Sequence, residues 1–154
     1  MKATMNRFVF VRRFAILLAA FGLVPVVAHR ATAEELSFDV DGIFSVTDSH
    51  GSQLSANVEG TLELGNGESL DFSIDAHVKH TGNHIEGTPA MVFDNGDTLT
   101  FYYEIKLDKD TGIYEGDFLI TGGTGEFAGA SGGGEICYPL AVAGPLMMDG
   151  ILRR

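Results

Sequence analysis

The chain has 154 residues, of which 21 are acidic and 10 are basic, so its formal net charge is −11 at pH 7. A strongly acidic surface repels phosphate backbones and anionic lipid headgroups, which argues against nucleic acid and membranes as partners. Cys137 is the only cysteine, which excludes an intramolecular disulfide.

The N-terminal residues have the features of a secretory signal. Four basic residues lie within the first thirteen positions, an apolar run follows at residues 14–27, and Ala31-Thr32-Ala33 offers a small-x-small cleavage site. The run is short for a membrane-spanning helix, which needs about 20 apolar residues. We therefore expect cleavage after Ala33, with Ala28 as a second possible site, and a secreted or periplasmic protein.

Residues 34–154 are expected to form a single domain, since a chain of this length builds one core rather than two. All 21 acidic residues but only five basic ones lie in this part, which gives it a formal charge of −16. With no helix signal in it, the domain is predicted to be all-β.

Alternation of apolar and polar residues with period two runs through this domain and predicts half-buried strands. It is cleanest at residues 70–78, where Leu70, Phe72 and Ile74 alternate with Asp71 and Ser73. The predicted strands span residues 36–46, 54–64, 70–78, 85–93, 98–107, 113–121, 135–141 and 146–152.

Short turns rich in Gly, Asn and Asp separate these strands, as at Gly65-Asn66-Gly67 and Asp94-Asn95-Gly96-Asp97. Short connections favour sequential antiparallel neighbours, because a parallel return needs a crossover of about a dozen residues. Eight such strands with one apolar face are predicted to close into an eight-stranded antiparallel up-and-down barrel. A two-sheet sandwich is the alternative.

A glycine-rich run at residues 120–132, Ile-Thr-Gly-Gly-Thr-Gly-Glu-Phe-Ala-Gly-Ala-Ser-Gly, follows the sixth predicted strand. Glycine tolerates positive φ, so we interpret the run as a structural corner. Its turn residues are predicted to be Gly122, Gly123, Gly125, Gly129 and Gly132.

This run, with Tyr138-Pro139 and the C-terminal Met148-Asp149-Gly150-Ile151-Leu152, resembles the allene oxide cyclase barrel family and the dirigent proteins. The resemblance implies the same barrel fold. It covers about the last thirty-five residues, and no upstream match to those families' catalytic groups is found, so no catalytic residue is carried over. No Ser-His-Asp constellation is evident either.

An aromatic stripe on the inward face suggests an apolar core or an apolar pocket. If a pocket is present, its ligand-binding residues are expected among Phe38, Phe72, Phe101 and Tyr103. Tyr103 is the one of these able to orient a polar ligand atom, because a buried phenol needs a hydrogen-bond partner.

Three histidines, His77, His80 and His84, lie close together around a turn and offer an alternative metal site for zinc or copper. The spacing argues partly against it, because His77 and His80 point to opposite faces of a regular strand. No metal and no cofactor is assigned in the leading interpretation.

The leading hypothesis is an exported, non-catalytic binding or scaffold barrel whose interior holds a small hydrophobic molecule. An isomerase or cyclase that confines a hydrophobic substrate is the alternative, and metal binding through the histidine hairpin is a further one. The partners expected are a small hydrophobic molecule, no nucleic acid and no membrane after signal removal, in a monomer or small homo-oligomer. Tyr102, Val92 and Ile43 are the candidates for an oligomer contact.

Overall fold

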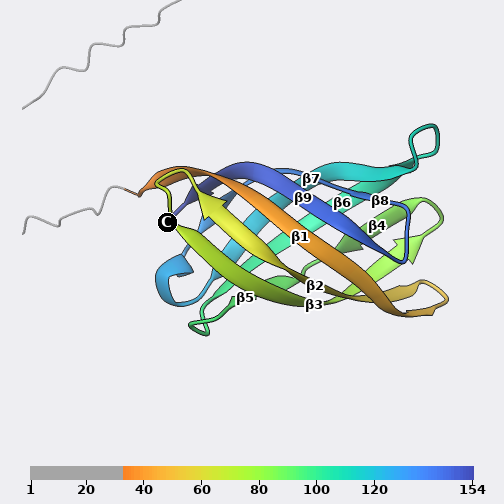
Figure 1. Cartoon of the computed structure of the whole chain (residues 1–154), viewed down its shortest axis with the longest axis horizontal. Coiled ribbons are helices and arrows are strands. Elements are labelled where there is room, and N and C mark those ends of the chain that lie inside the picture. The colour runs from red at the N-terminus through yellow and green to blue at the C-terminus, as the bar shows by residue number, and fades with distance from the viewer. Residues whose placement is uncertain (1–32) are drawn as a thin grey trace, which may run out of the picture. The chain divides into compact units, whose positions relative to one another are not determined.

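The structure, a computed structural model, describes residues 33–154; the predicted signal lies outside them except for Ala33. The described part is all-β apart from one turn of 3-10 helix, η1 (Gly125–Phe127) (Figure 1). None of its helices is long and apolar enough to span a membrane. The strands are β1 (Glu35–His50), β2 (Gln53–Leu64), β3 (Ser69–Thr81), β4 (His84–Gly87), β5 (Ala90–Phe93), β6 (Thr98–Asp108), β7 (Ile113–Gly123), β8 (Ser131–Pro139) and β9 (Ala143–Arg153).

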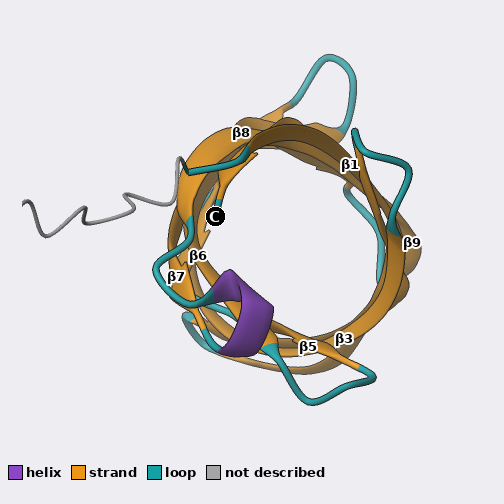
Figure 2. Cartoon of the chain, turned by 90° about the vertical axis from the view of Figure 1, so that its left-hand side faces the viewer, coloured by secondary structure: helices purple, strands orange, loops and turns teal. Residues whose placement is uncertain are grey.

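The strands form one closed antiparallel barrel, seen end-on in Figure 2. Strands that follow one another in the chain pair, except that β4 and β5 both pair with β3 and β6, and β9 pairs with β1 from Glu35↔Arg153 to Ser45↔Ala143, which closes the ring. The predicted eight-stranded barrel is therefore confirmed, and the sandwich alternative is wrong. Closure removes the two free edges that a sandwich sheet would expose.

One predicted strand, residues 85–93, is split into β4 and β5 but fills a single position in the ring. Pro89 interrupts it, since proline has no N–H for the ladder. The register is kept across the break, because Gly87 pairs with Tyr103 and Ala90 with Thr100. The Pro89 carbonyl still accepts a bond from Phe101 N at 3.2 Å.

The glycine run differs from its prediction, because strands enter it from both sides. Strand β7 continues to Gly123 and β8 begins at Ser131, so Gly132, Gly133 and Gly134 belong to the sheet. Gly134 faces Gly150 on β9, and a Cβ on either would collide with the neighbouring backbone. These strands can therefore approach only because the side chains are missing.

Aromatic rings fill the space above these glycines. Phe38 on β1 pairs with Gly150, and Phe118 on β7 pairs with Gly134. The two phenylalanine rings reach over the glycine pair and meet with centroids 5.7 Å apart. Phe101 joins them, 6.0 Å from Phe118 in an edge-on arrangement. This half of the barrel is a solid core.

The β7–β8 connection lies over the end of the barrel that faces the viewer in Figure 2. Its side chain Phe127 is fully buried and stacks on Phe93 at a centroid distance of 4.8 Å. Gly122, Gly125, Gly129 and Gly132 all have positive φ. At Gly125 the Asp97 carboxylate also occupies the space that a Cβ would need, so no other residue fits there without strain.

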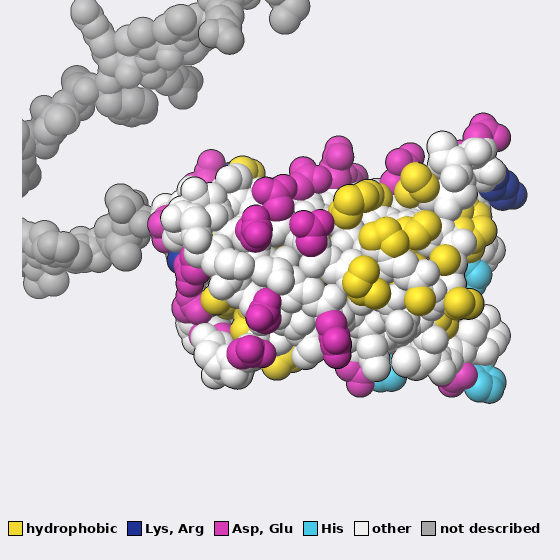
Figure 3. Space-filling model, in the orientation of Figure 1, with side chains coloured by type: hydrophobic (Ala, Val, Ile, Leu, Met, Phe, Trp, Pro, Cys, Tyr) yellow, Lys and Arg dark blue, Asp and Glu magenta, His cyan; other side chains and the backbone are white. Residues whose placement is uncertain are grey.

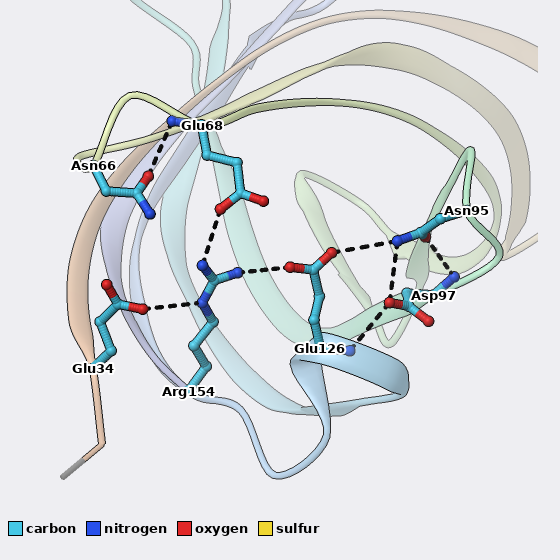
Figure 4. A network of polar contacts seen from close by, with 7 residues as sticks. All are labelled: Glu34, Asn66, Glu68, Asn95, Asp97, Glu126 and Arg154. Carbon is cyan, nitrogen blue, oxygen red and sulfur yellow. Dashed lines mark hydrogen bonds and ion pairs between the residues drawn. The ribbon is translucent and has the colours of Figure 1, made fainter. Parts of the chain in front are cut away.

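Arg154 ties this end together (Figure 4). Its guanidinium contacts the carboxylates of Glu68 at 2.9 Å, Glu126 at 3.0 Å and Glu34 at 3.5 Å. Its Cζ lies 5.9 Å from the centre of the Phe127 ring. The first and last described strands and two loops are thereby joined through one side chain that is 15% exposed. We call this end, with Arg154 and Phe127, the closed end.

Outward-facing carboxylates form a continuous row around the barrel. Neighbouring members occupy directly paired positions on seven consecutive strands, and the row runs Glu63, Asp39, Asp149, Glu135, Asp117, Glu104 and Glu86. Directly opposed like charges destabilise a sheet. On the face shown in Figure 3, carboxylates gather over the half toward the closed end and hydrophobic side chains over the other half.

Replacing Arg154 by Met is expected to lower the free energy of unfolding by roughly 1–3 kcal/mol, because three carboxylates lose a shared, poorly exposed cation. Arg153→Met is the matched control. Arg153 makes one pair with Glu35 at 2.7 Å and is 52% exposed, so its loss should cost no more than about 0.5 kcal/mol. Urea unfolding measures both, and equal losses would contradict a special role for Arg154.

Replacing Glu135 by Lys is expected to stabilise the barrel by roughly 0.5–2 kcal/mol, because it turns two like-charge pairs, with Asp117 and Asp149, into opposite-charge pairs. The gain should shrink in high salt. Glu59→Lys is the control, since Glu59 pairs with Ile43 and Ser73. If thermal unfolding shows the same gain for both variants, the carboxylate row has no specific cost.

Candidate ligand cavity

A cavity of about 410 Å³ occupies the half of the barrel away from the closed end. Its wall comes from β1, β2, β3, β4, β6, β7, β8 and β9, together with the β8–β9 connection, residues 140–142. Leu140 and Val142 in that connection are 59% and 79% exposed and also line the cavity. The cavity therefore reaches the surface there, and we call this the mouth.

The size of the inward side chains explains why the space is at this end. Along β3 the inward residues run Phe72, Ile74, Ala76 and Val78 from the closed end toward the mouth. Ala76 pairs directly with Ala56 on β2, so two small side chains face the interior side by side. An eight-stranded barrel is just wide enough for side chains to fill it, and small residues leave room for one ligand.

Of the seventeen residues that line the cavity, twelve are apolar. The remaining five are Ser49, His80, Tyr103, Tyr114 and Tyr138, so no lysine, arginine, aspartate or glutamate is among them. Apolar walls with a few convergent polar groups are typical of small-molecule sites.

The phenols of Tyr103 and Tyr138 both lie in the cavity wall. Burial raises the pKa of Tyr103 to about 12, although the neighbouring Tyr138 phenol lowers this pKa. Burial, together with the neighbouring Tyr103, also raises the pKa of Tyr138 well above its usual value. Both groups are therefore neutral hydroxyls at neutral pH, able to donate or accept but not to act as an anionic base.

Tyr138 also joins the aromatic part of the wall. Its ring lies 5.0 Å from Phe44 and 5.5 Å from Tyr114 by centroid distance. The Tyr114 hydroxyl lies 3.4 Å from His80 Nε2, a long contact from β7 to β3. The imidazole of His80 is half-buried and faces the interior.

The structure separates the residues that the sequence suggested for ligand binding. Tyr103 lines the cavity, whereas Phe38, Phe72 and Phe101 are buried in the solid half and do not line it. Sequence reasoning missed Tyr114 and Tyr138, which pair directly across β7 and β8. Both have the inward parity of their strands, and that signal was present in the sequence.

The three histidines do not meet. His77 faces outward, with Nδ1 2.9 Å from Ser55 Oγ, and His80 faces inward. His84 lies between Glu86 and Glu104, with Nε2 3.8 and 3.7 Å from their carboxylates. Within residues 33–154, no group of three or more His, Cys, Asp or Glu side chains is arranged to hold a metal ion. The histidine alternative is therefore set aside.

Cys137 faces outward, on the opposite side of β8 from Tyr138, and is only half-buried. Burial and the carboxylates of Asp149, Glu115 and Glu135 raise the pKa of its thiol. A raised pKa keeps the sulfur protonated and weakly nucleophilic. Cys137 is thus outside the cavity and has no role in its chemistry.

Comparison with solved structures supports the architecture. The chain is similar to the pterocarpan synthase dirigent protein GePTS1, with a TM-score of 0.54 and 13% sequence identity, over 88% of this chain and 99% of that one. No family model and no curated protein sequence matches. At this identity the likeness shows the fold, so the expected dirigent-like barrel is confirmed as a fold, and the allene oxide cyclase likeness stays a prediction.

The buried phenols predict a loss of stability in alkali. A folded pKa above the unfolded value of 10 means that the native state holds its proton longer, so stability is full below pH 10 and falls as pH rises toward 12. The fall amounts to as much as about 3 kcal/mol for Tyr103. In urea unfolding between these pH values, the free energy of unfolding should fall less for Tyr103→Phe than for the parent protein. Tyr102→Phe, on the outer face, should differ from the parent less than Tyr103→Phe does, because the pKa of the exposed Tyr102 phenol is raised less. A parent-like Tyr103→Phe would contradict the assignment.

Proposed function

We propose that this protein is a binding barrel that holds one small hydrophobic molecule in the cavity behind the mouth, as a carrier or scaffold that does not change the molecule. The single observation that carries the proposal is the uneven filling of the barrel. One half is a solid aromatic core, and the other leaves about 410 Å³ enclosed by mostly apolar walls.

The chemistry of the wall supports binding rather than catalysis. Its phenols are held neutral, its one imidazole contacts Tyr114, and charged side chains are lacking among the seventeen lining residues. General acid–base catalysis needs a group whose pKa lies near the working pH and within reach of the substrate. The dirigent-like fold is compatible with this role, since folds of this kind host binding sites of many sorts.

Export is part of the proposal. The basic residues, the apolar run and the Ala31-Thr32-Ala33 site support a cleaved leader at residues 1–33. The barrel's own pairing starts directly after it, because Glu34 N donates to Arg154 O at 2.8 Å and Glu34 O accepts from Arg154 N at 3.0 Å. A chain beginning at Glu34 therefore keeps every strand.

Native mass spectrometry of the protein purified from its export compartment tests these points together. We expect a chain mass matching residues 34–154, plus an excess the size of one small organic molecule that is released on denaturation. Ala76→Leu should lower the bound fraction, because the added carbons fill the cavity. Ser73→Leu, on the outer face of β3, should leave it unchanged. A bare parent chain that also binds no apolar probe would overturn the proposal.

A second candidate, an isomerase or cyclase that confines a hydrophobic substrate, is favoured by the position of Tyr103 in the cavity wall. Confinement accelerates reactions through orientation and needs little side-chain chemistry. Incubating the released molecule with the protein and analysing its isomers by chromatography distinguishes the two. Conversion that is lost in Tyr103→Phe while binding is kept would favour the enzyme, and an unchanged molecule would favour the carrier.

A further inference from the structure

We propose that the cavity selects neutral, mainly apolar molecules that carry one hydrogen-bond acceptor, such as a carbonyl oxygen, and that the hydroxyls of Tyr103 and Tyr138 recognise this atom. The inference rests on the proposed function and narrows it to a ligand class. Its basis is the position of these two hydroxyls in the cavity wall and the absence of Lys, Arg, Asp and Glu among the residues that line it.

Two phenol hydroxyls give the cavity wall its hydrogen-bond donors. Tyr103 and Tyr138 both line the cavity, and each phenol has one O–H proton that a ligand can accept. The third phenol in the wall, Tyr114, already lies next to His80 Nε2 at 3.4 Å. A ligand acceptor that reaches the hydroxyl proton of Tyr103 or Tyr138 replaces a water partner. A plain hydrocarbon instead leaves that proton unpaired in a poorly hydrated cavity.

Charged ligands are disfavoured by the same wall. Burying a carboxylate or an ammonium group is costly unless an opposite charge pairs with it, and none of the seventeen lining residues is Lys, Arg, Asp or Glu. The outward carboxylate row adds repulsion against anions approaching from outside.

Cations gain from that negative surface, but the cavity offers them little. A cage for an ammonium group needs open aromatic faces around a centre. Here the Tyr138 ring packs against Phe44 at 5.0 Å and Tyr114 at 5.5 Å, so the rings contact one another. The remaining ligand class is a neutral molecule with a hydrogen-bond acceptor, which fits both the apolar walls and the two hydroxyls.

Displacement of Nile red, a neutral dye that fluoresces in apolar sites, tests the inference on the whole purified protein. The competitors are undecane, methyl nonyl ketone, undecanoate and nonyltrimethylammonium. We expect the ketone to displace the dye at a concentration about tenfold lower than undecane, as one hydrogen bond predicts. Undecanoate and nonyltrimethylammonium should be weaker than the ketone, and undecanoate should improve as pH falls toward its pKa.

Variants locate the selectivity. Tyr103→Phe should lower the ketone's advantage over undecane, and the double variant Tyr103→Phe with Tyr138→Phe should remove most of it. Both should leave undecane binding unchanged. Tyr114→Phe is the matched control, since it deletes a phenol of the same wall that is engaged with His80, and it should keep the advantage. If Tyr103→Phe does not fold, the ranking of the four competitors on the parent protein still decides the question.

The outcomes separate the two proposals. If neither the dye nor any neutral competitor binds the parent protein, by displacement and by native mass spectrometry, the proposed binding function fails. If the ketone and undecane bind equally, or a charged competitor binds tightest, the function stands and the selectivity is overturned. An advantage that survives in the double variant Tyr103→Phe with Tyr138→Phe also overturns it.

Discussion

Close approach of backbones at paired glycines is the constraint on which the barrel depends. Gly134 and Gly150 face each other where β8 and β9 meet, and neither position has room for a Cβ. The missing side chains create an inner hollow, which Phe38 and Phe118 fill from the flanking strands. Glycine therefore sets the curvature of the wall, and phenylalanine restores the packing density that glycine removes.

The sizes of the inward side chains also divide the barrel into two halves with different roles. Large rings crowd the half near the closed end, where Phe127 and the contacts of Arg154 add further stabilisation. The half near the mouth has Ala56 and Ala76 in its wall and is left open. A cavity lowers the stability of a fold, and a binding site needs one. Here the packing of the solid half stabilises the barrel and so compensates for the cavity in the other half.

Much of this architecture could be predicted from the sequence, because period-two alternation and short polar turns dictate an antiparallel meander. The limits of the prediction have physical causes. Strands β7 and β8 extend into the glycine run, since glycine there serves close packing as well as turning. Alternation along the strand showed that Tyr103 faces the interior, but it does not show how far along the barrel axis a side chain lies. Phe38, Phe72 and Phe101 were therefore grouped with Tyr103, although they fill the other half. Depth follows from pairing register, which emerges only when the strands close.

The likeness to a dirigent protein at 13% identity fits this division. A barrel fold requires alternation, turns and space for curvature, and many sequences satisfy those conditions. The cavity wall is under a different constraint, since each polar group in it must be paired or face water. The hydroxyls of Tyr103 and Tyr138 lie in that wall, while Leu140 and Val142 extend its apolar part out to solvent. An apolar molecule entering there remains in contact with these apolar side chains along its path.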